Sequence, residues 1–414
     1  MEFTAKVRYV KPMFLRRTLP ALFFLFLTAF SGPCFAAKAP AKNDAARLAL
    51  LLEQVYKTMD DYYYLPVSRQ TYEDFTRAFP AKRLKDLNDQ SKKTEDFVHL
   101  GAGLLVNKLK SPADKFTNFL PPSKTKEFKS KVYAVTEDLG IEGTKTAEGF
   151  QVTKVQKHSE AYAQGLRTGD ILLKIDGVSL GGLEEKEIRT KLSPVLGSFV
   201  KLEVFLTAKK QKTEITLESK SYFRETVSMI DSGLPGVPVL KIAHFNQKTS
   251  EDFADELAAY GVDSVKHLVL DLRDNDGGPP LAAREILGFF LPANDHLFAI
   301  ARKKKSPVML TAPATALKIK APVTVLVNQK TGSAAEMFSG MLQAKKIAVL
   351  VGEKTAGATY LKSIYDFDDG SMVFMITSLT FFYDRRVYPA DGLTPDTPLA
   401  EGQDALRLVL DGLR

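Results

Sequence analysis

The alternation of strand-like and helix-like segments after about residue 223 restricts the fold more than any other feature of the chain. "VPVLKIAHF" and "VKHLVLDLRDNDGG" are short apolar runs typical of buried strands. Between them, "TSEDFADELAAYGV" has apolar residues at helical spacing behind a Thr or Ser cap. "APVTVLVNQKTGSAAEMFSGMLQA" repeats the order of strand, tight turn and helix. The pattern predicts helices packed on a mostly parallel or mixed sheet.

The part of the chain before residue 223 has two other patterns. "ARLALLLEQVYKTMDDYYYL" and "EDFVHLGAGLLVNKLK" have helical spacing, whereas short alternating, strand-like runs begin near Val132. The 414 residues also exceed what one compact core usually holds. We therefore predict a multidomain α+β protein. Its expected parts are a signal peptide (1–37), a helical N-terminal region (38–131), a small β-domain (132–222) and an α/β core (223–414).

The first residues predict export. Basic residues precede "LPALFFLFLTAF", which is too short to span a bilayer comfortably, and small residues follow in "CFAAKAP". Cleavage after Ala36 or Ala37 would remove Cys34, the only cysteine, and leave no thiol for disulfides or catalysis. The expected location is the periplasm or the exterior, or a membrane if the segment is retained as an anchor.

Charge and metal-ligand patterns point to no further partner. The net charge is +8, but no nucleic-acid-binding motif accompanies it, so we expect no nucleic acid. The run "RKKK" at 302–305 is interpreted as a solvated loop or strand end. No Cys/His cluster, H-E-x-x-H pattern or P-loop is present, and we expect neither a metal nor an organic cofactor.

Ser333, in "TGSAAEMFSG", lies between a buried strand and a helix, and two interpretations fit it. With Glu336 three residues later, it fits a helix-capping box. A serine in such a turn is also typical of a nucleophile, because the helix dipole and nearby N–H groups favour developing negative charge. Acyl transfer needs two N–H donors as well. Ala334 with Gly277 or Gly278, from the loop "DNDGG", would supply this oxyanion hole.

The segments "DLGIEG" and "AYAQGLRTGDILLKIDG", followed by a helix and a last strand, resemble a circularly permuted bacterial PDZ domain. The resemblance implies a groove in which an extended peptide adds a strand to a sheet edge. Leu139, Gly140 and Ile141 match the carboxylate-binding loop, whose bare N–H groups would hold a C-terminal carboxylate.

Four further segments, "VLDLRDNDGG", "VNQKTGSAAEMFSGMLQ", "VGEKTAG" and "GLTPDTPL", resemble the C-terminal processing peptidases, or tail-specific proteases, in this order. The resemblance implies a serine endopeptidase with a serine/lysine dyad that cuts near the C-termini of exported proteins. It places Ser333 at the nucleophile and implies that the PDZ domain recruits substrates with exposed apolar C-termini. An adaptor protein and a homo-oligomer are further expectations.

The general base departs from the family pattern, because Ala358 occupies the position of the catalytic lysine. If the segment is helical, Lys362 shares a face with position 358 and would reach the Ser333 hydroxyl. To act as a base it would also need burial to lower its pKa. Three alternatives remain open: a histidine base with Asp391 as its acid, a peptide-binding pseudoprotease, and a carrier of small ligands in an apolar cleft. The candidate histidines are His99, His158, His244, His267 and His296.

Overall fold

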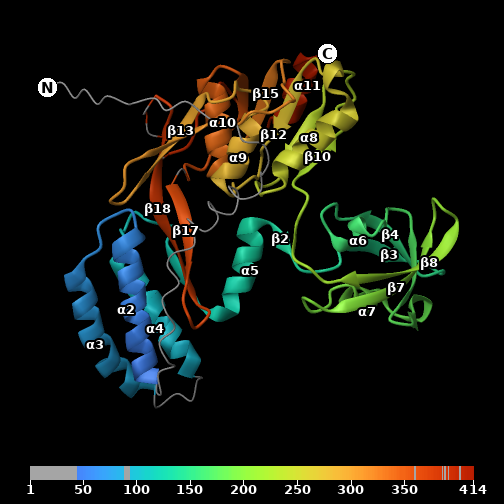
Figure 1. Ribbon diagram of the computed structural model, residues 1–414. Helices are drawn as coiled ribbons and strands as arrows, with labels where there is room; N and C mark the ends of the chain where they lie inside the picture. The colour runs from blue at the N-terminus through green and yellow to red at the C-terminus, as the bar shows by residue number, and fades with distance from the viewer. Residues whose placement is uncertain are drawn as a thin grey trace, which may run out of the picture.

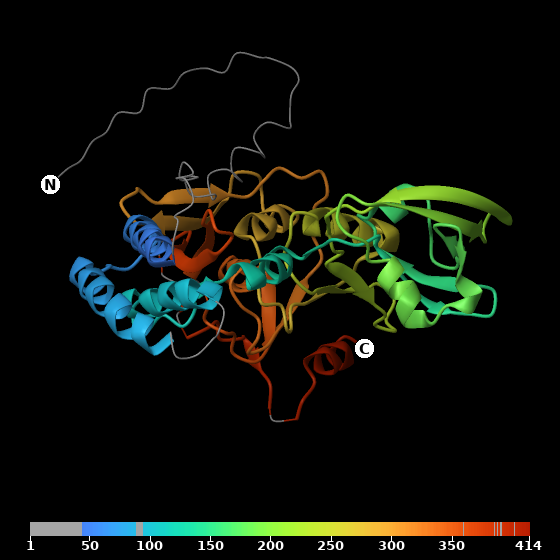
Figure 2. The ribbon, with the colours of Figure 1, turned by 90° about the horizontal axis from the view of Figure 1, so that it is seen from below.

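The computed structural model describes residues 44–87, 94–358, 360–384, 386, 388–389, 391–400 and 402–414. The predicted signal peptide lies outside these residues. A bundle of N-terminal helices and a small β-domain lie at opposite ends of a central α/β core (Figures 1 and 2). The predicted α+β class is confirmed, whereas the exact domain limits remain a prediction. In the described ranges, no helix is both long and apolar enough to cross a membrane.

The N-terminal region is mostly helical. One face of its first helix is buried, with Leu48, Leu52, Val55 and Met59 almost fully inaccessible to solvent. This spacing explains why the helix packs against its neighbours. The elements are α2 (Asp44–Tyr62), α3 (Arg69–Leu87), α4 (Thr94–Leu109), β1 (Asn118–Leu120) and α5 (Pro122–Tyr133).

The small β-domain is an antiparallel sheet in the order β3-β4-β5-β7-β8, with β6 beside β5. Its edge strand β3 lies opposite helix α7. The chain enters and leaves this domain through two paired strands, β2 and β9, in which Val135 faces Phe223. The elements are β2 (Val135–Thr136), β3 (Ile141–Lys145), β4 (Phe150–Val155), α6 (Glu160–Ala163), β5 (Ile171–Ile175), β6 (Val178–Ser179), η1 (Leu180–Gly182), α7 (Glu185–Lys191), β7 (Phe199–Leu206), β8 (Gln211–Glu218) and β9 (Tyr222–Phe223).

The core sheet has the order β10-β11-β12-β15-β16-β19, and every neighbouring pair except β10–β11 is parallel. The predicted α/β alternation is therefore confirmed. The elements are β10 (Val227–Ile230), β11 (Val239–Ile242), α8 (Thr249–Tyr260), η2 (Val262–Ser264), β12 (Leu268–Asp271), α9 (Pro280–Leu287), β15 (Val323–Val327), α10 (Ala334–Ala344), β16 (Ala348–Gly352), β19 (Thr397–Pro398) and α11 (Ala405–Gly412).

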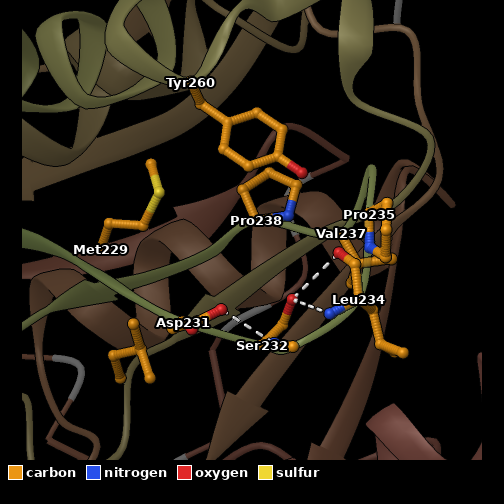
Figure 3. A pocket seen from close by; sticks show the side chains of 10 residues that line it. Met229, Asp231, Ser232, Leu234, Pro235, Val237, Pro238 and Tyr260 are labelled. Atoms are coloured by element: carbon orange, nitrogen blue, oxygen red, sulfur yellow. Dashed lines mark hydrogen bonds between the residues drawn. The ribbon is translucent and has the colours of Figure 1, made fainter.

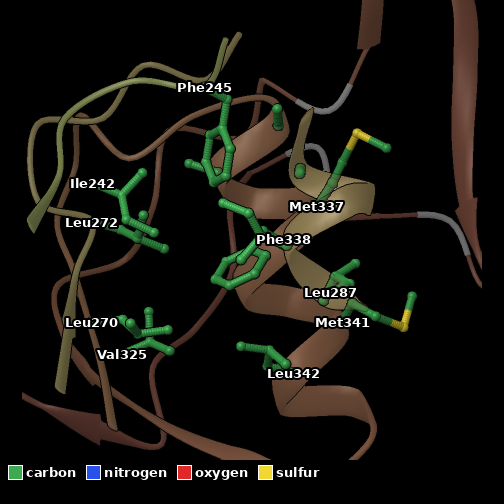
Figure 4. Packing of buried hydrophobic residues seen from close by; sticks show 14 of the residues in the cluster. Ile242, Phe245, Leu270, Leu272, Leu287, Val325, Met337, Phe338, Met341 and Leu342 are labelled. Atoms are coloured by element: carbon green, nitrogen blue, oxygen red, sulfur yellow. The ribbon is translucent and has the colours of Figure 1, made fainter. Parts of the chain in front are cut away.

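Helix α10 packs on this sheet. Met337, Phe338, Met341 and Leu342 are fully buried, and Figure 4 shows Phe338 and Leu342 facing the strand residues, Val325 among them, whereas the two methionines point to the other side of the helix. Each such side chain stabilises the fold by about 1.5–3 kcal/mol relative to an exposed position. The packing fixes the start of α10, and therefore Ser333, against the carboxyl ends of the parallel strands.

A second, antiparallel sheet joins the core to the N-terminal helices. Its order is β1-β18-β13-β14, with β17 also paired to β18. Figure 1 shows the long β17–β18 hairpin reaching from the core down to α2 and α4. Its strands are β13 (His296–Arg302), β14 (Val308–Thr311), β17 (Tyr360–Asp366) and β18 (Met372–Phe382). The basic run at 302–305 begins at the last residue of β13 and continues into the turn that follows, as expected.

Candidate active site

Ser333 sits in a strained turn at the N-terminus of α10. Its φ of 54° and ψ of −119° are rare for a residue with a Cβ, and such a conformation costs about 1–3 kcal/mol. The side chain is only partly buried. Ser333 and Glu336 also form a capping box. The turn thus has both predicted features, a helix cap and a nucleophile elbow.

Glu336 ties this turn to a second segment of the chain. Its carboxylate is fully buried and accepts a hydrogen bond from Ser333 N–H at 2.9 Å. It also accepts from Thr355 Oγ1 at 2.5 Å, Gly357 N–H at 2.7 Å and Ala358 N–H at 2.8 Å. Hydrogen bonds to a charged acceptor contribute about 1.5–3 kcal/mol each, so this set offsets the strain at Ser333.

The glycine loop after β12 lies directly against the elbow. A Cβ on Gly277 would be 2.7 Å from Ser333 Cβ and 2.9 Å from Ala334 N, and the residue has a φ of 109°. Only glycine fits this position without a shift of the backbone. The close approach of two backbone segments is what an oxyanion hole requires.

The two predicted glycine donors differ in this structure. Gly277 N–H donates to Oδ1 of the buried Asn275 at 2.9 Å, so it is not free for a substrate oxygen. Gly278 N–H makes no hydrogen bond to a described residue. Ala334 N–H, in the first turn of α10, has no partner within its helix. Ala334 and Gly278 are therefore the pair that we retain for the oxyanion hole.

Position 358 lies where a base would stand, but its side chain is a methyl group. The N–H groups of Ala358 and Ser333 donate to the same oxygen, Glu336 Oε2, which places the two residues side by side. The condition of a helix after Ala358, on which the predicted reach of Lys362 depended, is not met. Strand β17 begins at Tyr360, and Lys362 pairs with Ile376 of β18.

Lys362 is a partly buried lysine beside an aromatic ring. Its Nζ lies 4.4 Å from the ring centroid of Phe116, and it makes no hydrogen bond or salt bridge with a described residue, Ser333 included. Burial lowers the pKa of Lys362, and the charges of Glu336, Asp276 and Asp114 oppose this shift. A lowered pKa is the property that a lysine base needs.

Four of the five candidate histidines have side-chain hydrogen-bond partners, none of which is Ser333. His99 pairs with Asp369, His158 with Asp252, and His267 with the Thr324 hydroxyl. His244 contacts Asp276 and the Val132 carbonyl, and His296 lies exposed in β13. None of the five forms a hydrogen bond with Ser333. Asp391 is exposed and pairs with Lys354, so it is not the acid partner of a candidate histidine. The His244–Asp276 pair does lie at the glycine loop beside the elbow, with His244 Nε2 next to Gly278, but it is not bonded to Ser333.

The predicted carboxylate-binding loop of the small β-domain is not bare. Gly140 N–H donates to Asp138 Oδ1 at 2.7 Å, and Leu139 N–H donates to the Leu192 carbonyl at 3.4 Å. Ile141, the third member, begins β3 and pairs with Val155. The expectation of free amides at Leu139 and Gly140 is therefore wrong for this state, because the domain satisfies them internally.

Helix α7 also covers the edge of β3 where a peptide would add. Arg189 Nη2 donates to the Gly143 carbonyl at 2.9 Å, and Glu185 Oε2 accepts from Lys145 N–H at 3.4 Å. Arg189 and Glu185 form an ion pair at 2.7 Å. An added strand needs these outward N–H and C=O groups for its own ladder. The Glu185–Arg189 pair must therefore leave before a peptide binds.

We expect Arg189→Met to tighten binding of an apolar-tailed peptide about fivefold, because one net hydrogen bond of about 1 kcal/mol no longer competes. Fluorescence anisotropy with a labelled peptide measures the affinity. Lys191→Met, an exposed charge on the same helix, is the matched control and leaves the affinity unchanged. Weaker binding by Arg189→Met would mean that Arg189 contacts the peptide itself.

The hollow of about 310 Å³ shown in Figure 3 is remote from these groups. Residues 229–235, 237 and 238 and Tyr260 line it, and Asp231, Gly233 and Pro235 are exposed at its rim. It is a surface depression beside β10, and no residue of the elbow contributes to it. It gives no support to a carrier with a buried apolar cleft.

Comparison with known families finds two matches in this chain. Residues 236–399 match peptidase family S41, and residues 130–205 match the PDZ domain. The chain thus has one segment similar to PDZ domains and one similar to peptidase family S41. The elbow lies within the S41 match, and the edge of β3 beside α7 lies within the PDZ match.

The chain is also similar to curated proteins named as serine proteases. A "Probable CtpA-like serine protease" of Staphylococcus saprophyticus is 25% identical over 352 residues, covering 84% of this chain and 65% of the relative. Its counterpart in Staphylococcus aureus strain N315 is 26% identical over 322 residues, covering 76% and 63%. The chain thus spans slightly less than two thirds of these relatives. The resemblance to C-terminal processing peptidases is confirmed.

Solved structures are more distant in sequence. The photosystem II D1 C-terminal processing protease is 21% identical, with a TM-score of 0.45 over 87% of this chain and 94% of that one. A lipoprotein from Streptococcus agalactiae is 14% identical, with a TM-score of 0.48 over 92% and 99%.

Two residues near Lys362 were not singled out from the sequence. Phe116 and Asp114 belong to the segment "SPADKFTNF". The Asp two residues before a Phe indicates a turn, because Asp side chains cap backbone N–H groups two residues on. No local signal indicates that this turn lies beside β17.

Proposed function

We propose that this protein is an exported serine endopeptidase that cleaves polypeptides with exposed apolar C-termini. The elbow carries the proposal: Ser333 has a positive φ at a helix N-terminus, beside a glycine loop and a free Ala334 N–H. The S41 domain supports the chemistry, and the PDZ domain supports a peptide substrate. Export rests on the basic and apolar N-terminal stretch alone.

The reaction follows from the placement of these groups. Neutral Lys362 takes the proton of Ser333 as Oγ attacks the scissile carbonyl. The N–H groups of Ala334 and Gly278 then stabilise the oxyanion, and Lys362 returns the proton to the leaving amine. Water hydrolyses the acyl-enzyme in the reverse sequence. Because Lys362 and Ser333 are not hydrogen-bonded here, this route requires the lysine to move toward the elbow, and we propose that substrate binding drives the movement.

A peptide-binding pseudoprotease is the second candidate function. The observation that favours it is the methyl group of Ala358 at the position beside Ser333. On this proposal the PDZ groove captures tails and the elbow performs no chemistry.

Covalent labelling separates these two functions. The endopeptidase proposal predicts that a fluorophosphonate probe labels Ser333, as detected by mass spectrometry of the tryptic peptide, because an activated hydroxyl attacks phosphorus. Ser339, bonded to the Ala335 carbonyl within the same helix, serves as the internal control and stays unlabelled. An unlabelled Ser333, in protein that binds a tail peptide, would support the pseudoprotease instead.

A further inference from the structure

The N-terminal region is hydrogen-bonded to the β17–β18 hairpin opposite Lys362. In the hairpin register, Lys362 faces Ile376, next to an irregularity between Leu361 and Lys362. Ile376 N–H donates to Thr117 Oγ1 at 3.2 Å, and its carbonyl accepts from Tyr64 N–H at 3.0 Å. The strand opposite the proposed base is thus anchored on both its donor and its acceptor by the helical region.

A turn around the buried Asp114, in the same region, contacts the lysine through Phe116. Asp114 accepts hydrogen bonds from Tyr63 Oη at 2.8 Å, Phe116 N–H at 2.8 Å and Thr117 N–H at 2.9 Å. Although burial opposes it, these hydrogen bonds lower the pKa of Asp114, so the group is an anion at neutral pH. The turn holds the ring of Phe116 at 4.4 Å from Lys362 Nζ.

The surroundings of Lys362 therefore act in two directions. Burial favours the neutral amine, whereas the Phe116 face and three carboxylates favour the ammonium. Glu336 comes from α10, Asp276 from the glycine loop and Asp114 from the N-terminal turn. The first two come from the elbow and from the loop beside it, whereas the N-terminal turn contributes from outside both segments.

We propose that Phe116 and Asp114 are positioning residues for Lys362, which place its amine near the Ser333 elbow and set the balance between its charged and neutral forms. The inference rests on the proposed role of Lys362 as the base. It assigns the N-terminal helical region a part in the chemistry, since the turn reaches the site from outside the S41 and PDZ matches.

Titration of Lys362 tests this directly and needs no substrate. Protein labelled with ¹³C at lysine Cε gives a signal that moves with pH, and Lys362→Met identifies it by its loss. In Phe116→Leu we expect the midpoint to fall by about half a pH unit, because the ring no longer stabilises the cation. Asp114→Asn lowers it likewise through the loss of a carboxylate. Phe119→Leu, a ring in β1 that contacts His99 and Phe367, leaves it unchanged.

The pH profile of kcat adds a readout that a purely structural role would not move. We expect the rise in kcat to shift to lower pH in Phe116→Leu by the same amount as the NMR midpoint. An Lys362 midpoint unchanged in both Phe116→Leu and Asp114→Asn would overturn the inference. A shifted midpoint in a protein that cleaves nothing would leave the positioning role standing and refute the proposed endopeptidase.

Discussion

Ser333→Ala is expected to lower kcat for an unfolded, apolar-tailed polypeptide by about 10⁴-fold or more, since no covalent intermediate can form. The oxyanion donors and the PDZ groove remain, so peptide affinity stays unchanged. Gel or mass-spectrometric detection of the products measures cleavage, and anisotropy measures binding.

Ser339→Ala is the matched control for this experiment. The residue lies in the same helix, and its hydroxyl donates to a carbonyl within that helix, remote from substrate. We expect cleavage at the wild-type rate. Equal rates for the wild type and Ser333→Ala would show that any observed hydrolysis comes from another site or a contaminant.

Lys362→Met is expected to lower kcat by about 10²–10⁴-fold, the usual contribution of a general base. Burial lowers the pKa of Lys362, so in the wild type kcat rises with pH and begins to rise below the ordinary range for lysine. The variant loses this rise. A pH profile of kcat, recorded with the wild type and Lys354→Met as an exposed control, checks the prediction.

The same substitution has an opposite effect on stability. A lysine with a lowered pKa binds fewer protons when folded than when unfolded, so stability rises with pH through the window between the lowered and the ordinary pKa. Below this window the buried ammonium costs stability. Lys362→Met therefore leaves the free energy of unfolding unchanged or higher in a urea titration. A large destabilisation would mean that the loss of activity reflects misfolding.

Relocating the base is the stricter version of this test. Ala358 shares Glu336 Oε2 with Ser333, so Ala358→Lys in the Lys362→Met background places an amine beside the elbow. We expect this double variant to recover about tenfold or more of the lost kcat. If it recovers nothing while folding normally, the elbow lacks another requirement for catalysis.

Local patterns predicted the elements that carry the elbow, because each has a clear period and a clear end. Strand β15, Ser333 and helix α10 follow from an apolar run, a small polar turn and a capping Glu336. The same holds for α2, whose apolar face repeats at helical spacing. Such features depend only on neighbours within a few residues.

The predictions failed where contacts with segments distant in the sequence determine the local structure. The stretch after Ala358 forms a strand because Glu336 holds its start and Lys362 pairs with Ile376 of β18. The Gly277 N–H differs from the Gly278 N–H because it donates to the side-chain oxygen of Asn275, which no property of glycine itself predicts. Contacts of this kind depend on the packed structure, which periodicity does not encode.

The short ribbon of β2 and β9 has a consequence for the architecture as a whole. Val135 and Phe223 are partners, and the Arg224 N–H continues the ladder to the Ala134 carbonyl. The PDZ domain is thus an insertion whose two ends meet at the paired strands β2 and β9. Exchange of this domain for another peptide-recognition module of similar end-to-end spacing would direct the elbow to new sequences, because the core sheet that positions Ser333 is left intact.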